Sequence, residues 1–253
     1  MTGPVRRAMA YLAVLAVVLV VWQLLTVLGA VPVLVLPTPA SVGEALRGIL
    51  SDPAAVLASV TTTFGQAALA FVIAAVLGVV VGVGLGLSRL LRDSYEPLLA
   101  DLNAVPLVIL YPVLAAVLGL GSASKVALGA MYGFFPVAIA CLAATSHVDR
   151  DLVTAARAMG AHRRRVLVQV VMPAISGPLT SGLRAGLGLA LVTVVAGEFI
   201  AGTAGLGYQL AASSEGFHAP ALYAWLLITV AVIVALNGGL TALTHLSQKG
   251  LRR

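Results

Sequence analysis

The sequence predicts an all-α, polytopic membrane protein of about six transmembrane helices, and two observations lead to this prediction. Of the 253 residues, 60% are hydrophobic and only 9% are charged, and the mean hydropathy is +1.08. A soluble domain carries about 25% charged residues, so this chain cannot cover a globular surface with polar groups, and lipid must cover part of it. The apolar residues also occur in runs of about 20, the length with which a helix crosses the hydrocarbon core.

Six apolar runs are expected to be spans, and together they make one transmembrane domain, 1–253. The first is longer than the apolar core of a signal peptide, so we interpret it as an uncleaved span. Pro106, Pro112 and Pro136 interrupt the third and fourth runs, and a short interfacial helix is predicted near 40–50. The expected spans are 8–31, 57–87, 97–118, 124–146, 174–201 and 219–244.

The positive charges predict the orientation of these spans. With a cytoplasmic N-terminus, all of the 15 Lys and Arg residues except Arg47, Lys125 and Arg184 fall in segments on the inner side. Cytoplasmic loops of membrane proteins carry an excess of Lys and Arg. We therefore expect both termini and the loop 147–173 to be cytoplasmic. The net charge of +6 has the same explanation, so no nucleic-acid partner is expected.

The loop 147–173 is predicted to begin with a short helix. Asp149 or Asp151 can accept a hydrogen bond from the first free backbone N–H groups. Gly160 is expected to end the helix, because glycine adopts the positive φ found at helix C-termini. Residues at helical spacing form one small apolar face. This face consists of Leu152, Ala155, Ala156 and Met159.

A second, basic helical stretch is predicted over 162–172, before Pro173. Its three arginines, Arg163–Arg165, can anchor the following span at the membrane surface. Anchoring explains the charge. It does not explain a short helix with a small apolar face that ends at a glycine, which is a shape suited to a groove on another protein.

This loop resembles that of the permeases of ATP-binding-cassette importers, whose pattern is E-A-A, three residues, G, nine residues, I-x-L-P. The present chain has Thr154-Ala155-Ala156, then Gly160 at the same spacing, then 170–173 with the proline in place. Thr154 replaces the family's Glu. The resemblance implies that the short helix is a coupling helix that docks on a separate ATPase subunit. The implied coupling residues are Thr154, Ala155, Ala156, Arg157, Met159 and Gly160.

Further motifs are similar to the nitrate/sulfonate/taurine-type permeases of that family. They include "LPTPASV" at 36–42, "SGLRAGLGLA" at 181–190 and "VAGEFIAGTAGLGYQL" at 195–210, whereas Ile109 departs from the usual pattern in span three. The resemblance implies two ATPase subunits that hold ATP and Mg²⁺, an extracytoplasmic binding protein, a second permease copy and an inner-membrane location. No cofactor is expected in this chain. The solute stays open among nitrate, sulfonates, taurine and heterocycles such as thiamine precursors.

Glycines recur in two places. Gly78, Gly82 and Gly86 share one face of the second span, where they allow another helix to approach closely, either within the bundle or from a second subunit. Gly205 and Gly207 belong to a Gly-rich turn at 202–210 on the outer side. By family resemblance this turn meets the binding protein or closes the pathway, so Gly205, Gly207 and Tyr208 are pathway or gating candidates.

Arg184 and Glu198 are the ionisable residues of the fifth span. They are 14 residues apart, which is about 21 Å along a helix, too far for a direct pair. Charged groups inside membranes usually face protein or a water-filled path. Arg184 is expected to anchor the helix or line the pathway, and Glu198 either lines the pathway or holds the Gly-rich turn.

Two other functions compete with an importer permease. An ion-coupled secondary transporter would need acidic residues or broken helices near the midplane. A membrane-embedded enzyme would need a cluster of catalytic or metal-binding residues, but the four His residues are scattered and Cys141 is the single cysteine. We therefore expect a transport subunit without catalytic residues and without a metal.

Overall fold

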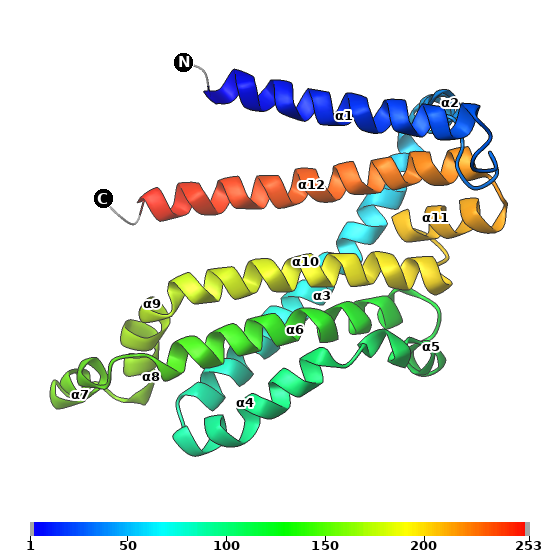
Figure 1. The fold of residues 1–253 in the computed structure, drawn as a ribbon. Coiled ribbons are helices and arrows are strands. Elements are labelled where there is room, and N and C mark those ends of the chain that lie inside the picture. The colour runs from blue at the N-terminus through cyan, green and yellow to red at the C-terminus, as the bar shows by residue number, and fades with distance from the viewer. Residues whose placement is uncertain (1–2, 251–253) are drawn as a thin grey trace. The chain divides into compact units, whose positions relative to one another are not determined.

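The computed structural model describes residues 3–250, with side chains for residues 6, 9–11, 13, 14 and 16–235. All secondary structure in this described part is helical, as predicted (Figure 1). The chain divides into two compact units, one of residues 1–60 and 208–253 and the other of residues 61–207. Arg252 and Arg253, which contribute to the orientation argument, lie outside the described residues.

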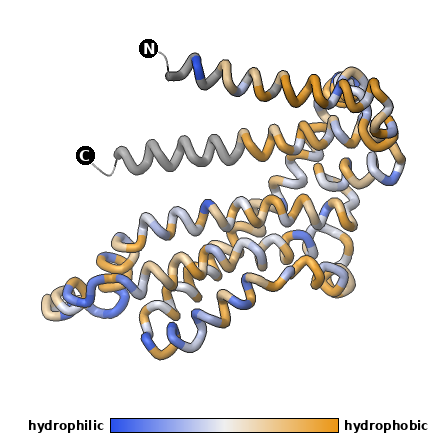
Figure 2. The backbone as a smooth tube through the Cα atoms, viewed as in Figure 1, coloured by the Kyte–Doolittle hydropathy of each residue, from blue (hydrophilic) through white to orange (hydrophobic). Residues whose placement is uncertain are grey.

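Four described stretches are long and apolar enough to cross a membrane unaided. Hydrophobic residues line most of their length, and hydrophilic residues gather near α7, α8 and the first turns of α4 (Figure 2). The helix at the predicted sixth span, α12 (Ala219–Gly250), is described with side chains only as far as residue 235. The four stretches are Met9–Val27, Pro53–Gly86, Ser122–Ser146 and Ser176–Glu215.

The unit of residues 1–60 and 208–253 contains α1 (Gly3–Val27), α2 (Pro39–Leu50) and α12. α2 is the helix predicted near 40–50, and it begins where the Thr38 side chain accepts a hydrogen bond from the Ser41 N–H. The Trp22 indole N–H donates to the Pro37 carbonyl at 2.8 Å, and the Trp22 and Tyr223 rings lie 5.8 Å apart. These contacts fasten the segment between α1 and α2.

The unit of residues 61–207 is built around α3 (Pro53–Gly86), α6 (Ser122–Ser146) and α10 (Ser176–Ala201), and α6 and α10 lie side by side (Figure 1). Gly78, Gly82 and Gly86 face α6. A Cβ atom added at Gly82 would lie 2.3 Å from the Ala138 carbonyl oxygen, and one added at Gly86 would lie 2.7 Å from the Thr145 Cβ. The glycines therefore bring α3 against α6 within one chain.

The predicted third span, 97–118, is not one straight helix. α4 (Arg89–Ala104) is followed by a 3₁₀ turn (Leu107–Leu110) and α5 (Tyr111–Leu118), and the chain bends by 76° between the two halves. Pro106 explains the break, because it has no N–H to donate and forces the preceding residue into extended backbone, with ψ 129° at Val105. Pro112 lies harmlessly in the first turn of α5, and α6 continues through Pro136.

Candidate functional site

α7 (Arg150–Ala158) is a short helix that is capped at both ends by neighbouring residues of the chain. At its start the Asp149 side chain accepts a hydrogen bond from the Asp151 N–H at 2.8 Å, so Asp149 is the cap of the two candidates. At its end Gly160 has φ +83°. The N–H groups of Gly160 and Ala161 donate to the carbonyls of Arg157 and Ala156 at 2.9 and 3.0 Å. This is the pattern of a Schellman motif, and it requires a left-handed residue at the glycine.

The predicted apolar face of α7 divides into two parts. Ala156 is buried, and with Val153 it packs on the cluster that includes Val83, Cys141 and Val171. The rest of the predicted face points away from the protein. Leu152 is 53% exposed and Met159 82% exposed, and Ala155 is also exposed. We call Leu152, Ala155 and Met159 the apolar stripe of α7.

The return from α7 to the membrane is helical but irregular. Instead of one regular helix over 162–172, α8 (Arg163–Val166) continues into a π-helical segment (Leu167–Val171) and α9 (Met172–Ala174). Val166 and Val171, five residues apart, are both buried. The wider turn of a π-helix places such residues on the same side. The three arginines of α8 are exposed, in keeping with a position at the bundle's end.

The other end of α10 carries a buried polar cluster around Glu198. This side chain is fully buried, and the Thr63 hydroxyl lies 3.0 and 2.8 Å from its two carboxyl oxygens. The Gly207 N–H donates to the same carboxyl group at 3.0 Å, and the Leu206 N–H donates to the Thr63 hydroxyl oxygen at 2.8 Å. We refer to Thr63, Glu198, Gly205, Leu206 and Gly207 as the Glu198 cluster.

The turn after α10 is shorter than predicted, and it is fitted to Glu198. It occupies only residues 202–205, because α11 (Leu206–Glu215) already begins within the predicted 202–210 turn. Gly205 has φ +102°, and an added Cβ would lie 2.2 Å from a Glu198 carboxyl oxygen. Only glycine satisfies both the backbone conformation and the contact. Of the two roles considered for Glu198, the geometry matches holding the turn.

Lys125 is a buried charged residue whose position the sequence did not predict. The charge count assigns it to an external loop, but it lies in the first turn of α6 and is only 2% exposed. Its ammonium group donates to the carbonyls of Leu120, Gly121 and Ala201, the last two at 3.0 Å. It thereby ties the end of α10 to the α5–α6 connection. Gly197 makes room for it, since a Cβ there would lie 3.1 Å from the Lys125 Cγ, but no signal in the sequence joins the two residues.

The structure does not bring the remaining candidates into this cluster. Arg184 is half-buried near the other end of α10, and Tyr208 is 37% exposed on α11. Among the described residues, no group of three or more His, Cys, Asp or Glu side chains could hold a metal ion. The site therefore has two parts at the two ends of α10, the α7 loop and the Glu198 cluster.

Comparison with known proteins identifies relatives over most of the chain. The taurine transport system permease protein TauC of Escherichia coli is 31% identical over 94% of this chain and 88% of its own length. The riboflavin transport system permease protein RibX of Chloroflexus aurantiacus is 33% identical over 87% and 81%. The putative aliphatic sulfonates transport permease protein SsuC of Bacillus subtilis is 27% identical over 86% and 78%.

The family model for the binding-protein-dependent transport system inner membrane component matches residues 74–253, a stretch that contains α7, Lys125 and Glu198. Members are transport subunits rather than enzymes, and they work with an ATPase and a binding protein. The loop with its exposed helix and the apolar spans are what such a subunit requires. The chain belongs to the inner membrane components of binding-protein-dependent transport systems, the permease subunits of ATP-binding-cassette importers.

Proposed function

We propose that two copies of this permease form the translocation pathway of the importer and that α7 of each copy docks on one of two ATPase subunits. The exposed apolar stripe of α7 carries this proposal. Leu152 and Met159 stay 53% and 82% exposed in the folded chain, and exposed apolar side chains grouped on one element mark a contact with a partner. ATP and Mg²⁺ are held by the ATPase subunits, and this chain needs no cofactor.

The attachment of α7 suits the transmission of force. Its inner residues Val153 and Ala156 pack on a cluster that contains Val83 of α3 and Cys141 of α6, and its C-terminus is locked by the Schellman hydrogen bonds at Gly160. A displacement of α7 by the ATPase is therefore passed to the spans as a rigid-body movement. Repacking of the spans between inward-open and outward-open states gives alternating access.

The Glu198 cluster is proposed to work on the opposite side of the membrane. In this proposal the α7 loop and both termini lie in the cytoplasm, on the inner side of the inner membrane. The turn 202–205 then faces the extracytoplasmic binding protein. Glu198 and Lys125 hold this turn through buried hydrogen bonds. The turn then offers the binding protein a fixed surface at the mouth of the pathway, whereas Arg184 remains a candidate for the pathway itself.

The proposed solute is a small organic anion of the sulfonate class. The relatives named for taurine and for aliphatic sulfonates support it. The relative named for riboflavin supports a second candidate, a heterocycle of the flavin or thiamine-precursor type. A thermal-shift screen of the cognate binding protein separates the two. Stabilisation by sulfonates and not by flavins or pyrimidines supports the first, and the reverse result replaces it with the second.

Docking is tested by placing a charge in the apolar stripe. Leu152→Asp and Met159→Asp bury an unpaired carboxylate in the contact, so each is expected to abolish co-purification of the ATPase and uptake. Ala158→Asp is the matched control, because Ala158 is exposed on the same helix but outside the stripe. All three variants are expected to insert normally and to unfold within about 0.5 kcal/mol of the wild type. Normal ATPase binding by both stripe variants would refute the docking role.

A further inference from the structure

We propose that a cavity beside α7 is a binding site for a phosphate-bearing anion. The cavity has a volume of about 250 Å³ and lies between the α3–α4 turn, the end of α6 and α7. Four arginines line it, Arg89 and Arg92 from α4 and Arg150 and Arg157 from α7. We call it the arginine pocket. Its volume far exceeds the about 15 Å³ that holds one water molecule, so a phosphate group fits with water around it.

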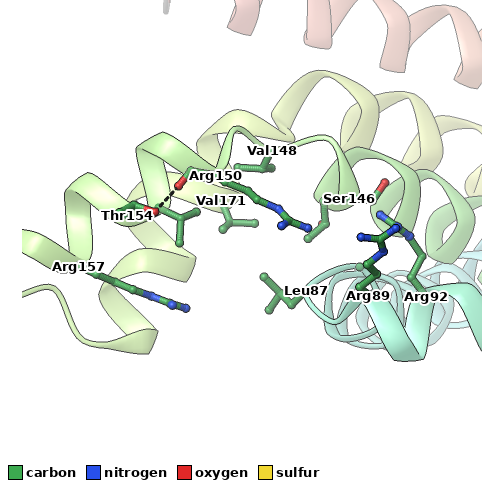
Figure 3. A pocket seen from close by; sticks show the side chains of 12 residues that line it. Leu87, Arg89, Arg92, Ser146, Val148, Arg150, Thr154, Arg157 and Val171 are labelled. Atoms are coloured by element: carbon green, nitrogen blue, oxygen red, sulfur yellow. Dashed lines mark hydrogen bonds between the residues drawn. The ribbon is translucent and has the colours of Figure 1, made fainter.

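All four arginines line the pocket, and three of them lie near Ser146. Figure 3 shows the Arg150 guanidinium directed toward Ser146, with the Arg89 and Arg92 side chains on the other side of Ser146, and Arg157 directed toward Leu87. The groups come from helices far apart in the sequence. Arginine presents a planar fork of N–H donors that matches phosphate in a bidentate manner, so convergence of several forks is the chemistry that recognises a phosphate group.

The positive charge in the pocket is only partly balanced by the protein. No acidic side chain lines the pocket. Asp93, an exposed neighbour, lies 3.1 Å from Arg92 and 3.8 Å from Arg89. Within the part of the chain whose side chains are described, Arg150 and Arg157 have no ion-pair partner. Like charges held around one cavity repel each other, and an anion at its centre removes that repulsion.

A buried hydroxyl in the same pocket also lacks a partner. Thr145 is only 5% exposed, and its Oγ1 atom makes no hydrogen bond with the protein. A buried polar group without a partner is destabilising, so native proteins seldom keep one without a reason. Thr145 is among the residues that line the arginine pocket, and we infer that its hydroxyl turns to donate to the oxygen of a bound phosphate group. The unpaired hydroxyl is an observation independent of the charges.

The phosphate group can come from a lipid headgroup or from a free anion. Leu87 and Leu90, 58% and 77% exposed, flank Arg89 at the end of α3, as in a segment at the membrane surface, where basic pockets between helices bind anionic headgroups. In either case the bound anion bridges Arg89 and Arg92 of α4 to Arg150 and Arg157 of α7. Binding itself requires neither the ATPase nor transport, so it is tested on the permease alone.

The test uses the purified full-chain permease and two probes. Inorganic phosphate is titrated onto the protein in neutral detergent. Phosphatidylglycerol retention is measured by native mass spectrometry after release from nanodiscs of phosphatidylcholine and phosphatidylglycerol in equal parts. The double variant Arg150→Gln/Arg157→Gln is expected to weaken binding at least about tenfold, which corresponds to about 1.4 kcal/mol. Arg164→Gln/Arg165→Gln is the matched control, with the same charge loss at exposed residues of the same loop.

Thr145→Val tests the hydroxyl separately. Valine has the same shape, and the lost hydroxyl has no protein partner to strand. The variant is therefore expected to keep the unliganded protein's thermal stability, or to raise it, and to weaken anion binding several-fold.

Each outcome decides the proposal. Binding of either probe that is lost in the pocket variants and kept in the control supports the site. The probe that binds identifies the source, lipid headgroup or free anion. The proposed site is overturned if neither probe binds, or if the control variant loses as much anion binding as the pocket variants. It is also overturned by a result in which the pocket variants keep both anions but lose the ATPase, since the arginines then serve a protein partner.

Discussion

The α7 loop and the Glu198 cluster lie toward opposite ends of α10 (Figure 1). They differ in how far their side chains are buried and hydrogen-bonded. At the α7 end, apolar side chains are exposed, four arginines surround a cavity, and the Thr145 hydroxyl has no partner. At the other end, Glu198 is fully buried, its carboxyl group accepts hydrogen bonds from Thr63 and Gly207, and Lys125 donates to three carbonyls.

We infer from this difference that the Glu198 end is completed by the chain itself, and we propose that the α7 end is completed by a partner. Buried polar groups are costly unless they are hydrogen-bonded, and the Glu198 cluster meets that condition internally. The α7 end leaves both apolar and charged groups available. A subunit that passes the movement of a partner to its own spans needs one end that binds the partner and one end whose structure is fixed by its own contacts.

The largest expected effect is at Glu198, and it distinguishes a structural role for this residue from a role in solute binding. Glu198→Ala removes the acceptor of the buried Gly207 N–H and leaves a space beside Gly205, so it is expected to lower the free energy of unfolding by about 3 kcal/mol. Unfolding of the purified permease in mixed detergent measures this loss. Glu215→Ala, at an exposed position of α11, is the control and is expected to change stability by less than about 0.5 kcal/mol. Wild-type stability with lost uptake would instead make Glu198 a pathway residue.

A smaller loss is expected at Lys125. Lys125→Met keeps the apolar stem but removes the donor to Leu120, Gly121 and Ala201, which is expected to cost about 2 kcal/mol. Hydrogen exchange should rise first in the last turn of α10, whose terminal carbonyl loses its partner. Arg47→Met is the control, since Arg47 is another cation assigned to the outer side but is exposed. Unchanged exchange at the end of α10 would show that Lys125 does not hold the turn.

The smallest effect concerns the end of α7. Gly160→Ala forces a Cβ into left-handed backbone, at a cost of about 1 kcal/mol, although the space around it is open. Local opening should increase about fivefold and be detected as faster hydrogen exchange of the Gly160 and Ala161 amides. Gly160→Asn should be milder, because Asn tolerates this conformation. Gly177→Ala is the control, because an added Cβ at Gly177 also meets no atom and the φ of Gly177 is not positive. No loss of stability is expected in this variant. If the amides of residues 160 and 161 exchange at the same rate in Gly160→Ala and in Gly177→Ala, the Schellman motif is not the reason why position 160 is a glycine.

Local chemistry allowed much of the α7 loop to be predicted. Asp149 and Gly160 act through contacts within a few residues, so the sequence sufficed to place the start and the end of the helix. Four of the six expected spans correspond to described helices that are long and apolar enough to cross a membrane, whereas the expected span 97–118 is bent. Ala156 and Leu152 share the predicted apolar face, but only Ala156 is buried. A helical period cannot tell which part of an apolar face packs on the bundle and which part stays exposed.

The sequence by itself determined that this is a helical membrane protein with a capped helix in a basic loop, because hydropathy, capping and glycine conformation are local properties, whereas its assignment as a permease came from motif resemblance. Only the tertiary structure decided that Lys125 is buried, that Glu198 holds the turn through Thr63, 135 residues away, and that arginines of α4 and α7 surround one cavity. Such contacts join residues distant in the chain, and a polar side chain satisfied by a distant partner has no mark in its own neighbourhood.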